Sequence, residues 1–288
     1  MESVLDRTLE NVSNIVHLEH VNVKQSDQRL ATLFYVSALG LTRDPYMMTG
    51  VDNMWINIGR NQMHLPTGNP QRLRGTIGLI VPDLAALRHR LTEVLSPLSG
   101  TQFGFVDREI FFEVTCPWGN RFRCHAPAAE FGGTELAIAY VEFTVPPETA
   151  GGIARFYGEI MGAAAKTGIR DGAITASVCA GRDQYLFFRE TAEDIESYDG
   201  HHIQIYIADF SGPYRRLLER KRLTRDTDVH EWRFRDIVDV ETNVVLFTIE
   251  HEVRSLKHPL FGRPLVNRNP AQSTGNYIRG KDAFPGTF

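Results

Sequence analysis

The sequence of 288 residues predicts an α+β fold in which one domain occurs twice, over 15–127 and 136–253, followed by an arm at 254–288. Two kinds of observation predict it: an internal repeat, and a strand-helix-strand pattern that recurs within each copy. Anchors that recur at one fixed offset indicate a repeated structural unit. Three anchors share an offset of 122 residues: Phe34-Tyr35 with Phe156-Tyr157, Gly40 with Gly162, and Gly59-Arg60 with Gly181-Arg182.

The first copy begins with a pattern typical of one β-α-β-β-β unit. A strand-like run over 18–23 precedes apolar residues at helical spacing over 27–39, and Gly40 is expected to end the helix. Alternating β-branched and aromatic residues between turn residues then predict three strands. These strands are expected at 41–44, 53–58 and 61–66.

A second unit of the same kind follows within each copy. In the first copy the elements are a strand at 76–81, a helix at 84–95 and strands at 102–106, 109–115 and 121–125. In the second copy they are a strand at 203–207, a helix at 212–221 and strands near 230–235 and 244–250. Asp83 and Asp209 precede the helices and are predicted to cap them, because a carboxylate accepts from free N-terminal amides. The chain therefore has four units, two per copy.

Composition excludes several classes of protein. With 31 basic and 35 acidic residues the formal charge is −4, and no basic stripe indicates a nucleic-acid partner. No apolar run reaches the length of a membrane span, so we expect a cytoplasmic protein with no membrane partner. The three cysteines lack C-x-x-C spacing and are interpreted as reduced thiols. Nucleophile-elbow, phosphate-loop and dinucleotide motifs are absent from the sequence.

Four segments together resemble the vicinal oxygen chelate superfamily, which includes glyoxalase I, extradiol dioxygenases and the bleomycin and fosfomycin resistance proteins. They are His20-Val-Asn-Val, the segment 34–41, Pro117-Trp-Gly-Asn120 and the segment 202–210. The resemblance covers 15–253. It implies two tandem glyoxalase-like domains, each of two paired β-α-β-β-β units that form a half-open cup for a divalent metal and a small ligand.

The resemblance implies a degenerate site in the first domain. The motif positions there hold His20, His64, Thr76 and Arg123. Only the two histidines are competent ligands, and the charge of Arg123 would repel a metal ion. We therefore interpret His20 and His64 as a vestigial site, with a hydrogen-bonded core role as the alternative for each histidine.

In the second domain the resemblance points to a metal held by Glu142, His202 and Glu250. Glu142 stands 122 residues after His20, and His202 stands seven before Asp209. Leu246 takes the place where the family has glutamate, so Glu250 would need a bulge or a longer turn to reach the site. The alternative for Glu250 is an exposed strand end. Fe, Mn, Zn, Ni and Co are not distinguished by this set.

The arm contains many Pro, Gly and Asn residues, yet too many apolar residues for a disordered tail. One interpretation is a lid over the second cup, with Arg263 or Arg268 meeting an anionic substrate and Tyr206 lining the cup. The other, which we prefer, is an arm packed on its own body or on a partner subunit.

Two classes of function follow from these expectations. The first is a metal-dependent small-molecule enzyme of dioxygenase, isomerase or lyase type. The second is a metal-free small-molecule binding or resistance protein that uses the cups as apolar pockets. A small-molecule ligand is expected in both, and a homodimer is left open.

Overall fold

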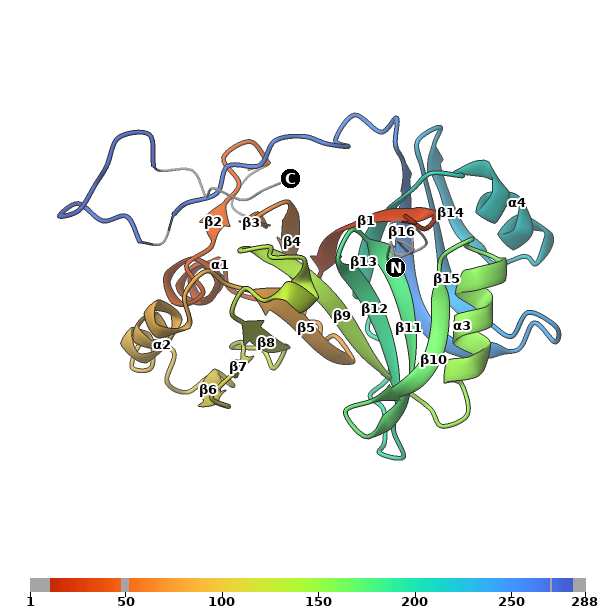
Figure 1. Ribbon diagram of the computed structural model, residues 1–288, viewed down its shortest axis with the longest axis horizontal. Helices are drawn as coiled ribbons and strands as arrows, with labels where there is room; N and C mark the ends of the chain where they lie inside the picture. Colours follow the sequence, from red (N-terminus) through yellow and green to blue (C-terminus); the bar gives the residue numbers. More distant parts are fainter. Residues whose placement is uncertain (1–10, 48–51, 270, 282–288) are drawn as a thin grey trace, which may run out of the picture.

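The computed structural model describes residues 11–47, 52–269 and 271–281. These form two mixed eight-stranded sheets with short helices packed on them (Figure 1). The predicted α+β class of two tandem glyoxalase-like cups is confirmed. In the described part of the chain, no helix is long and apolar enough to cross a membrane.

The first half of the chain contains two β-α-β-β-β units, as the pattern predicts. The first comprises β1 (Ile15–Asn22), α1 (Gln28–Ala31), the π-helical η2 (Thr32–Ala38), β2 (Thr42–Arg43), β3 (Asn53–Ile58) and β4 (Asn61–Pro66). The second comprises β5 (Gly75–Ile80), α2 (Leu84–Glu93), β6 (Gly104–Asp107), β7 (Phe111–Thr115) and β8 (Arg121–His125), with the 3-10 turn η3 (Ala129–Phe131) leading out of it.

The second half repeats this order. Its first unit comprises β9 (Ala137–Val145), α3 (Ala150–Glu159), β10 (Ala165–Arg170), β11 (Ala173–Gly181) and β12 (Gln184–Glu190). Its second comprises β13 (His202–Ile207), α4 (Ser211–Glu219), β14 (Leu223–Asp228), β15 (Glu231–Val238) and β16 (Val245–Ser255). Gly40 and Gly162 follow the equivalent helices at φ 76° and 67°, a left-handed conformation that ends a helix and favours glycine.

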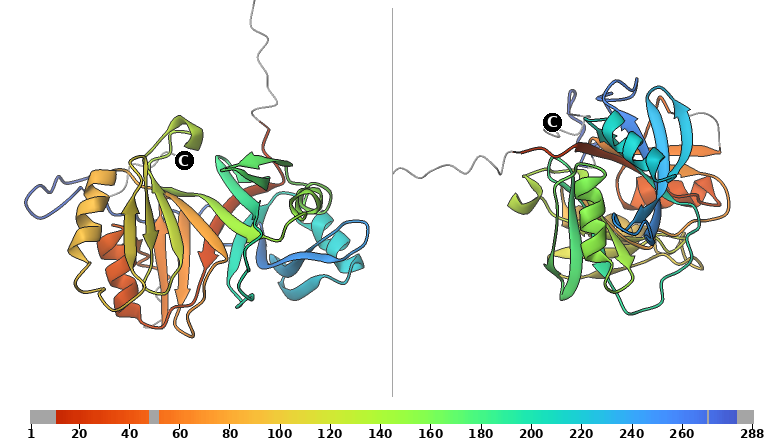
Figure 2. Two further views of the ribbon diagram at one scale, coloured as in Figure 1. Left: turned by 90° about the horizontal axis from the view of Figure 1, so that it is seen from below. Right: turned by 90° about the vertical axis from the view of Figure 1, so that its right-hand side faces the viewer.

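The sheets join units from the two halves of the chain, which corrects the expected pairing within each copy. The strand order is β14-β15-β16-β13-β1-β4-β3-β2 in the first sheet and β10-β11-β12-β9-β5-β8-β7-β6 in the second. The first unit therefore pairs with the fourth through β1 and β13, and the second with the third through β5 and β9. Each sheet therefore spans both halves of the chain, which form the two lobes visible in the left view of Figure 2.

Packing within each half explains this pairing. The two units of a half face each other through their helix-bearing sides, where Phe34 lies 5.6 Å from Phe122 and Phe156 lies 5.8 Å from Phe234 between ring centroids. All four rings belong to one buried core. Within each unit the first strand lies at the edge of that unit's own strands. The first strand of each unit therefore completes its hydrogen bonding with a strand from the other half.

Two buried amides fasten the sheets to each other. Asn61 donates to the carbonyl of Leu18 at 2.7 Å and accepts from the amide of Ile138 at 2.9 Å. Gln184 donates to the carbonyls of Leu18 and Ile138 at 3.0 and 3.1 Å. Both residues follow the repeated Gly-Arg turns, so the repeat anchors lie at the junction between the two sheets.

The C-terminal arm packs on the first unit (Figure 1). Asn57 donates to the carbonyl of Val266 at 2.7 Å, and the Asn267 amide exchanges two hydrogen bonds with the backbone of Gly59. The arm therefore packs on its own chain, as the preferred interpretation expected.

Candidate metal centre

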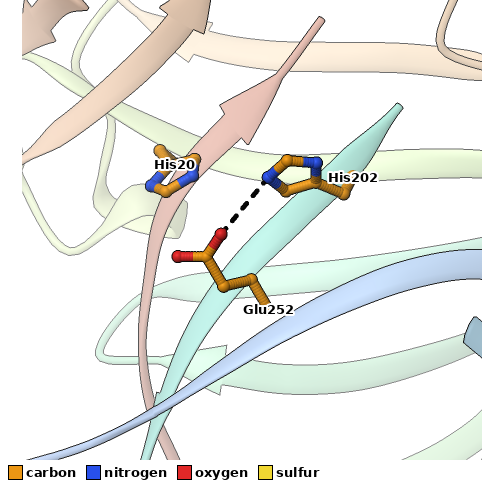
Figure 3. A group of neighbouring side chains, drawn as sticks. All are labelled: His20, His202 and Glu252. Atoms are coloured by element: carbon orange, nitrogen blue, oxygen red, sulfur yellow. Dashed lines mark ion pairs between the residues drawn. The ribbon is translucent and has the colours of Figure 1, made fainter. Parts of the chain in front are cut away.

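Three potential metal ligands meet on adjacent strands of the first sheet: His20 on β1, His202 on β13 and Glu252 on β16. Their ligand atoms all lie within 4.8 Å of one another (Figure 3). The strand register explains the meeting. His20 stands opposite Gln204, and Gln204 stands opposite Glu252, so Glu252 reaches the space between the two histidines.

The histidines present free nitrogen atoms to this space. Nδ1 of His20 lies 2.5 Å from the Glu19 carboxylate, while its Nε2 has no hydrogen-bond partner although the side chain is buried. Nε2 of His202 also makes no hydrogen bond and lies 3.4 Å from Oε2 of Glu252. Burial lowers the pKa of His202, which favours the neutral imidazole that binds metal. A buried ring nitrogen without a protein partner can bind a metal ion or a water molecule.

Glu252 is ionised and held in place by two arginines. Arg254 Nη2 lies 2.5 Å from its Oε1, and Arg233 bonds its Oε2. Burial would raise the pKa of this carboxyl, but His202 and both arginines hold it far below its ordinary value. The carboxylate is therefore available as an anionic ligand at neutral pH.

His64, the second histidine of the predicted vestigial site, is engaged elsewhere. Its Nδ1 lies 2.6 Å from the Asn22 amide and its Nε2 lies 2.7 Å from Asn53 Oδ1. The ring also stacks on Trp55 at 3.8 Å between centroids. Burial lowers its pKa to about 2. His64 therefore forms a neutral wall of the site, and it is not one of the three grouped ligands.

A cavity of about 260 Å³ adjoins the group. Its walls include Glu19 and Trp55, which contact His20, and Arg254, which is paired with Glu252. The arm supplies the opposite wall through 260–263 and Leu265. The arm therefore covers the cup of the first sheet. The lid interpretation had placed it over the cup of the second domain instead.

The structure separates the predicted set Glu142, His202 and Glu250. Glu142 lies on β9 in the second sheet, opposite Thr76, with Arg189 at 3.3 Å and Arg170 at 3.6 Å. The placement follows from the pairing of β9 with β5, which sets the third unit against the second.

Glu250 lies beside His202 in the strand register but turns to Arg233 at 2.9 Å. Glu252, two residues further along the same face, takes the position between the histidines. The last strand is longer than expected, since it continues to Ser255, and this extra length carries Glu252 into the site.

Among the predicted substrate-binding residues, Tyr206 lines the cavity and its hydroxyl has no hydrogen-bond partner. Arg263 also lines it, but its guanidinium is paired with the buried Asp44 at 2.9 Å. Arg268 donates to the backbone carbonyl of Val36 and is not part of the cavity wall.

The residues that sequence reasoning missed are Glu252, Glu19 and Arg254. The sequence pointed to Glu252 indirectly. Glu250 and Glu252 are two residues apart in a strand and so point to the same face, where either could reach a ligand on the next strand. Glu19 gave none, since a neighbour of His20 is expected on the opposite face.

The residues present fit a divalent metal ion. Two imidazoles and one carboxylate form a mixed nitrogen and oxygen donor set, which suits Fe, Mn, Co, Ni or Zn. Both free nitrogens are Nε2 atoms, and the hydrogen bond from His20 Nδ1 to a carboxylate is the usual support of a metal-bound histidine.

Comparison with known proteins extends the description of the fold. No family model and no curated protein matches the sequence. Among solved structures, glyoxalase I from Zea mays superposes with a TM-score of 0.57 at 11% identity, over 83% of this chain and 92% of that one. A protein from Bacillus subtilis proposed to be a dioxygenase superposes with a TM-score of 0.55 at 14% identity, over 88% and 92%. This chain therefore has the fold of glyoxalase I, as the resemblance implied.

Proposed function

We propose that the protein is a metal-dependent enzyme of the vicinal oxygen chelate type, with its metal held by His20, His202 and Glu252. The observation that carries the proposal is the convergence of these three groups within 4.8 Å, with no hydrogen bond to Nε2 of either histidine. The fold supports it, since glyoxalase I, which has a similar fold, is an enzyme.

Of the three reaction types expected from the sequence, dioxygenase chemistry suits this donor set best. Two histidines and one carboxylate on a single face are typical of non-haem Fe(II) oxygenases. When bound, the metal would act as a Lewis acid toward oxygen atoms of a small substrate.

The charges around the group favour a divalent cation. The ion-pair network contains the carboxylates of Glu19, Glu231, Glu250 and Glu252 and the guanidiniums of Arg233 and Arg254. Four negative and two positive groups leave a surplus of two negative charges. A surplus in a mostly buried network is stabilised by a cation of matching charge.

The chain's own residues would orient the ligands and the substrate. Glu19 holds the Nδ1 proton of His20, which keeps Nε2 free, and Arg254 fixes the Glu252 carboxylate. Trp55, Tyr206 and the arm residue Phe261 supply aromatic walls that would exclude water and position a flat apolar substrate.

Metal analysis of the full-length protein tests the proposal. Protein prepared without chelator and reconstituted anaerobically with Fe²⁺ is expected to bind about one equivalent. His202→Ala and Glu252→Gln should lose it, whereas the matched carboxyl variant Glu142→Gln in the other sheet should retain it. Retention of metal by Glu252→Gln together with loss in Glu142→Gln would contradict this site.

Reactivity is a separate measurement. Fe(II) protein exposed to nitric oxide should give the S = 3/2 electron paramagnetic resonance signal of an iron with a vacant position, as a substrate-binding centre requires. Stoichiometric metal without this signal would argue for a structural ion.

A metal-free binding protein is the second candidate, and one observation favours it. Both oxygens of Glu252 are already paired with arginines, so the carboxylate is satisfied without a metal. In that case the wild-type protein would take up no Fe²⁺, and the aromatic cavity alone would bind ligand.

A further inference from the structure

The polar face of the second sheet contains a second cup, separate from the metal centre. Two adjoining cavities of about 430 and 420 Å³ lie there, and both are lined by Arg123 on β8. Their size is that of small-molecule sites in proteins. His20, His202 and Glu252 line neither of these cavities.

Arginines and carboxylates both line this cup, and the carboxylates lie closer to solvent. Arg123 and Arg170 are 26% and 33% exposed, whereas Glu113 and Asp171 are 38% and 55% exposed. Arg189 and Arg170 share one buried carboxylate, Glu142, at 3.3 and 3.6 Å. Arg123 is paired only with Asp171, whose side chain is 55% exposed at the rim. Because solvent screens the rim pair, Asp171 neutralises the interior weakly. Arg123 and Arg170 are therefore screened less by solvent than the carboxylates at the rim.

Aromatic rings line the same space. The Arg170 guanidinium lies 4.1 Å from the ring centroid of Phe187 and 5.2 Å from that of Tyr140. Tyr185 stacks nearly parallel to Phe187 at 5.6 Å although its side chain is partly exposed. A guanidinium and an aromatic ring presented side by side complement a flat ligand with an anionic group.

We propose that the second cup is a binding site for a small planar organic anion of the aromatic carboxylate class. Arg170 and Arg123 meet the carboxylate, and the exposed ring of Tyr185 contacts the ring of the ligand. The metal ligands lie on the other sheet, so this site functions without the metal and is independent of the proposed activity.

Isothermal titration calorimetry on the full-length protein tests this site with benzoate as the probe. Benzoate is expected to bind at one saturable site. Benzamide, which has the same shape without the charge, should bind at least about tenfold more weakly, because charge-assisted hydrogen bonds to guanidinium are lost. Cyclohexanecarboxylate keeps the charge but lacks the flat ring, and should also bind more weakly.

Variants locate the binding. Arg170→Gln and Arg123→Gln should each weaken benzoate binding about tenfold or more. Arg155→Gln, an exposed arginine paired with Asp239 on another surface, should leave it unchanged. His202→Ala should also leave it unchanged, which separates this site from the metal centre.

Three outcomes would overturn the proposal. Absence of saturable benzoate binding removes the site. Equal affinity for benzoate and benzamide removes the anion selectivity. Binding that disappears in His202→Ala but persists in both arginine variants places the probe in the first cup. Circular dichroism of each variant separates loss of the site from loss of the fold, and two independent arginine variants keep the test decisive if one misfolds.

Discussion

The Glu19 carboxylate lies 2.5 Å from Nδ1 of His20, its immediate neighbour in the chain. Consecutive residues of a regular strand point to opposite faces, so such a contact is unexpected. A shift of register between Leu18 and His20 explains it, because a bulge brings Glu19 onto the face of His20. The bulge therefore builds the supporting carboxylate of the proposed metal ligand into β1 itself.

Glu19→Gln is predicted to weaken metal binding about 10- to 100-fold, the usual effect of losing an outer-shell carboxylate. The amide keeps the shape of the side chain but loses the charge that fixes the Nδ1 proton. Co²⁺ titration followed by visible absorption measures the affinity.

Glu113→Gln, a partly exposed glutamate on the second sheet, is the matched control and should leave the affinity unchanged. An unchanged Co²⁺ affinity in Glu19→Gln would show that this carboxylate does not support the metal.

The repeat and the unit pattern were enough to predict the fold. Phe34 and Phe156 are both fully buried in equivalent helices, and the predicted ranges of most strands match those observed. These features are local, since periodicity and turn residues are properties of neighbouring positions.

The pairing of units could not be predicted in the same way. The first strand of each unit has one unpaired edge. Local sequence does not determine which other first strand pairs with that edge. The assignment of Glu142 depended on pairing within a copy, and the cross-pairing of β1 with β13 places His20 with His202 instead. The identity of the third ligand depended on the register of β16, where a shift of two residues separates Glu250 from Glu252.

Gln184→Leu is predicted to destabilise the protein by about 3 kcal/mol. The side chain is 1% exposed and hydrogen-bonds the backbone of Leu18 and Ile138, which belong to different sheets. Leucine would leave these backbone groups without partners. Urea unfolding measures the loss, and the exposed Gln102→Leu should stay within about 0.5 kcal/mol of wild type. Equal stability of the two variants would refute the role of Gln184 at the junction.

Arg263→Ala is predicted to release the arm and destabilise the protein by about 3 kcal/mol, the scale for leaving a buried charge unpaired. Burial would raise the pKa of Asp44, but Arg263 and the amides of Tyr46 and Met47 hold it below its ordinary value. Arg268→Ala removes a bond to a backbone carbonyl only and should cost less than about 1 kcal/mol.

Limited proteolysis of the arm, with thermal unfolding, distinguishes these two variants. Faster cleavage of Arg263→Ala than of Arg268→Ala is expected. The same cleavage rate for both would mean that the Asp44 ion pair does not hold the arm.

The buried His251 is predicted to make stability depend on pH. Its Nδ1 donates to the carbonyl of Ile249 at 2.8 Å, its Nε2 accepts from the Tyr157 hydroxyl at 2.6 Å, and its ring stacks on Phe234. Burial lowers its pKa from 6.5 to about 3. Below pH 6.5 the unfolded chain therefore takes up a proton that the folded chain refuses, and stability falls as the pH drops toward 3.

At pH 5 this residue alone should remove about 2 kcal/mol of the stability present at pH 7. Urea unfolding of wild type and His251→Gln at both pH values isolates the effect, because other histidines contribute equally to both proteins. The wild type should lose about 2 kcal/mol more than the variant between pH 7 and pH 5. His89→Gln, at an exposed position on α2, should lose as much as the wild type. An equal loss in wild type and His251→Gln would mean that the pKa of His251 is the same in the folded and unfolded states.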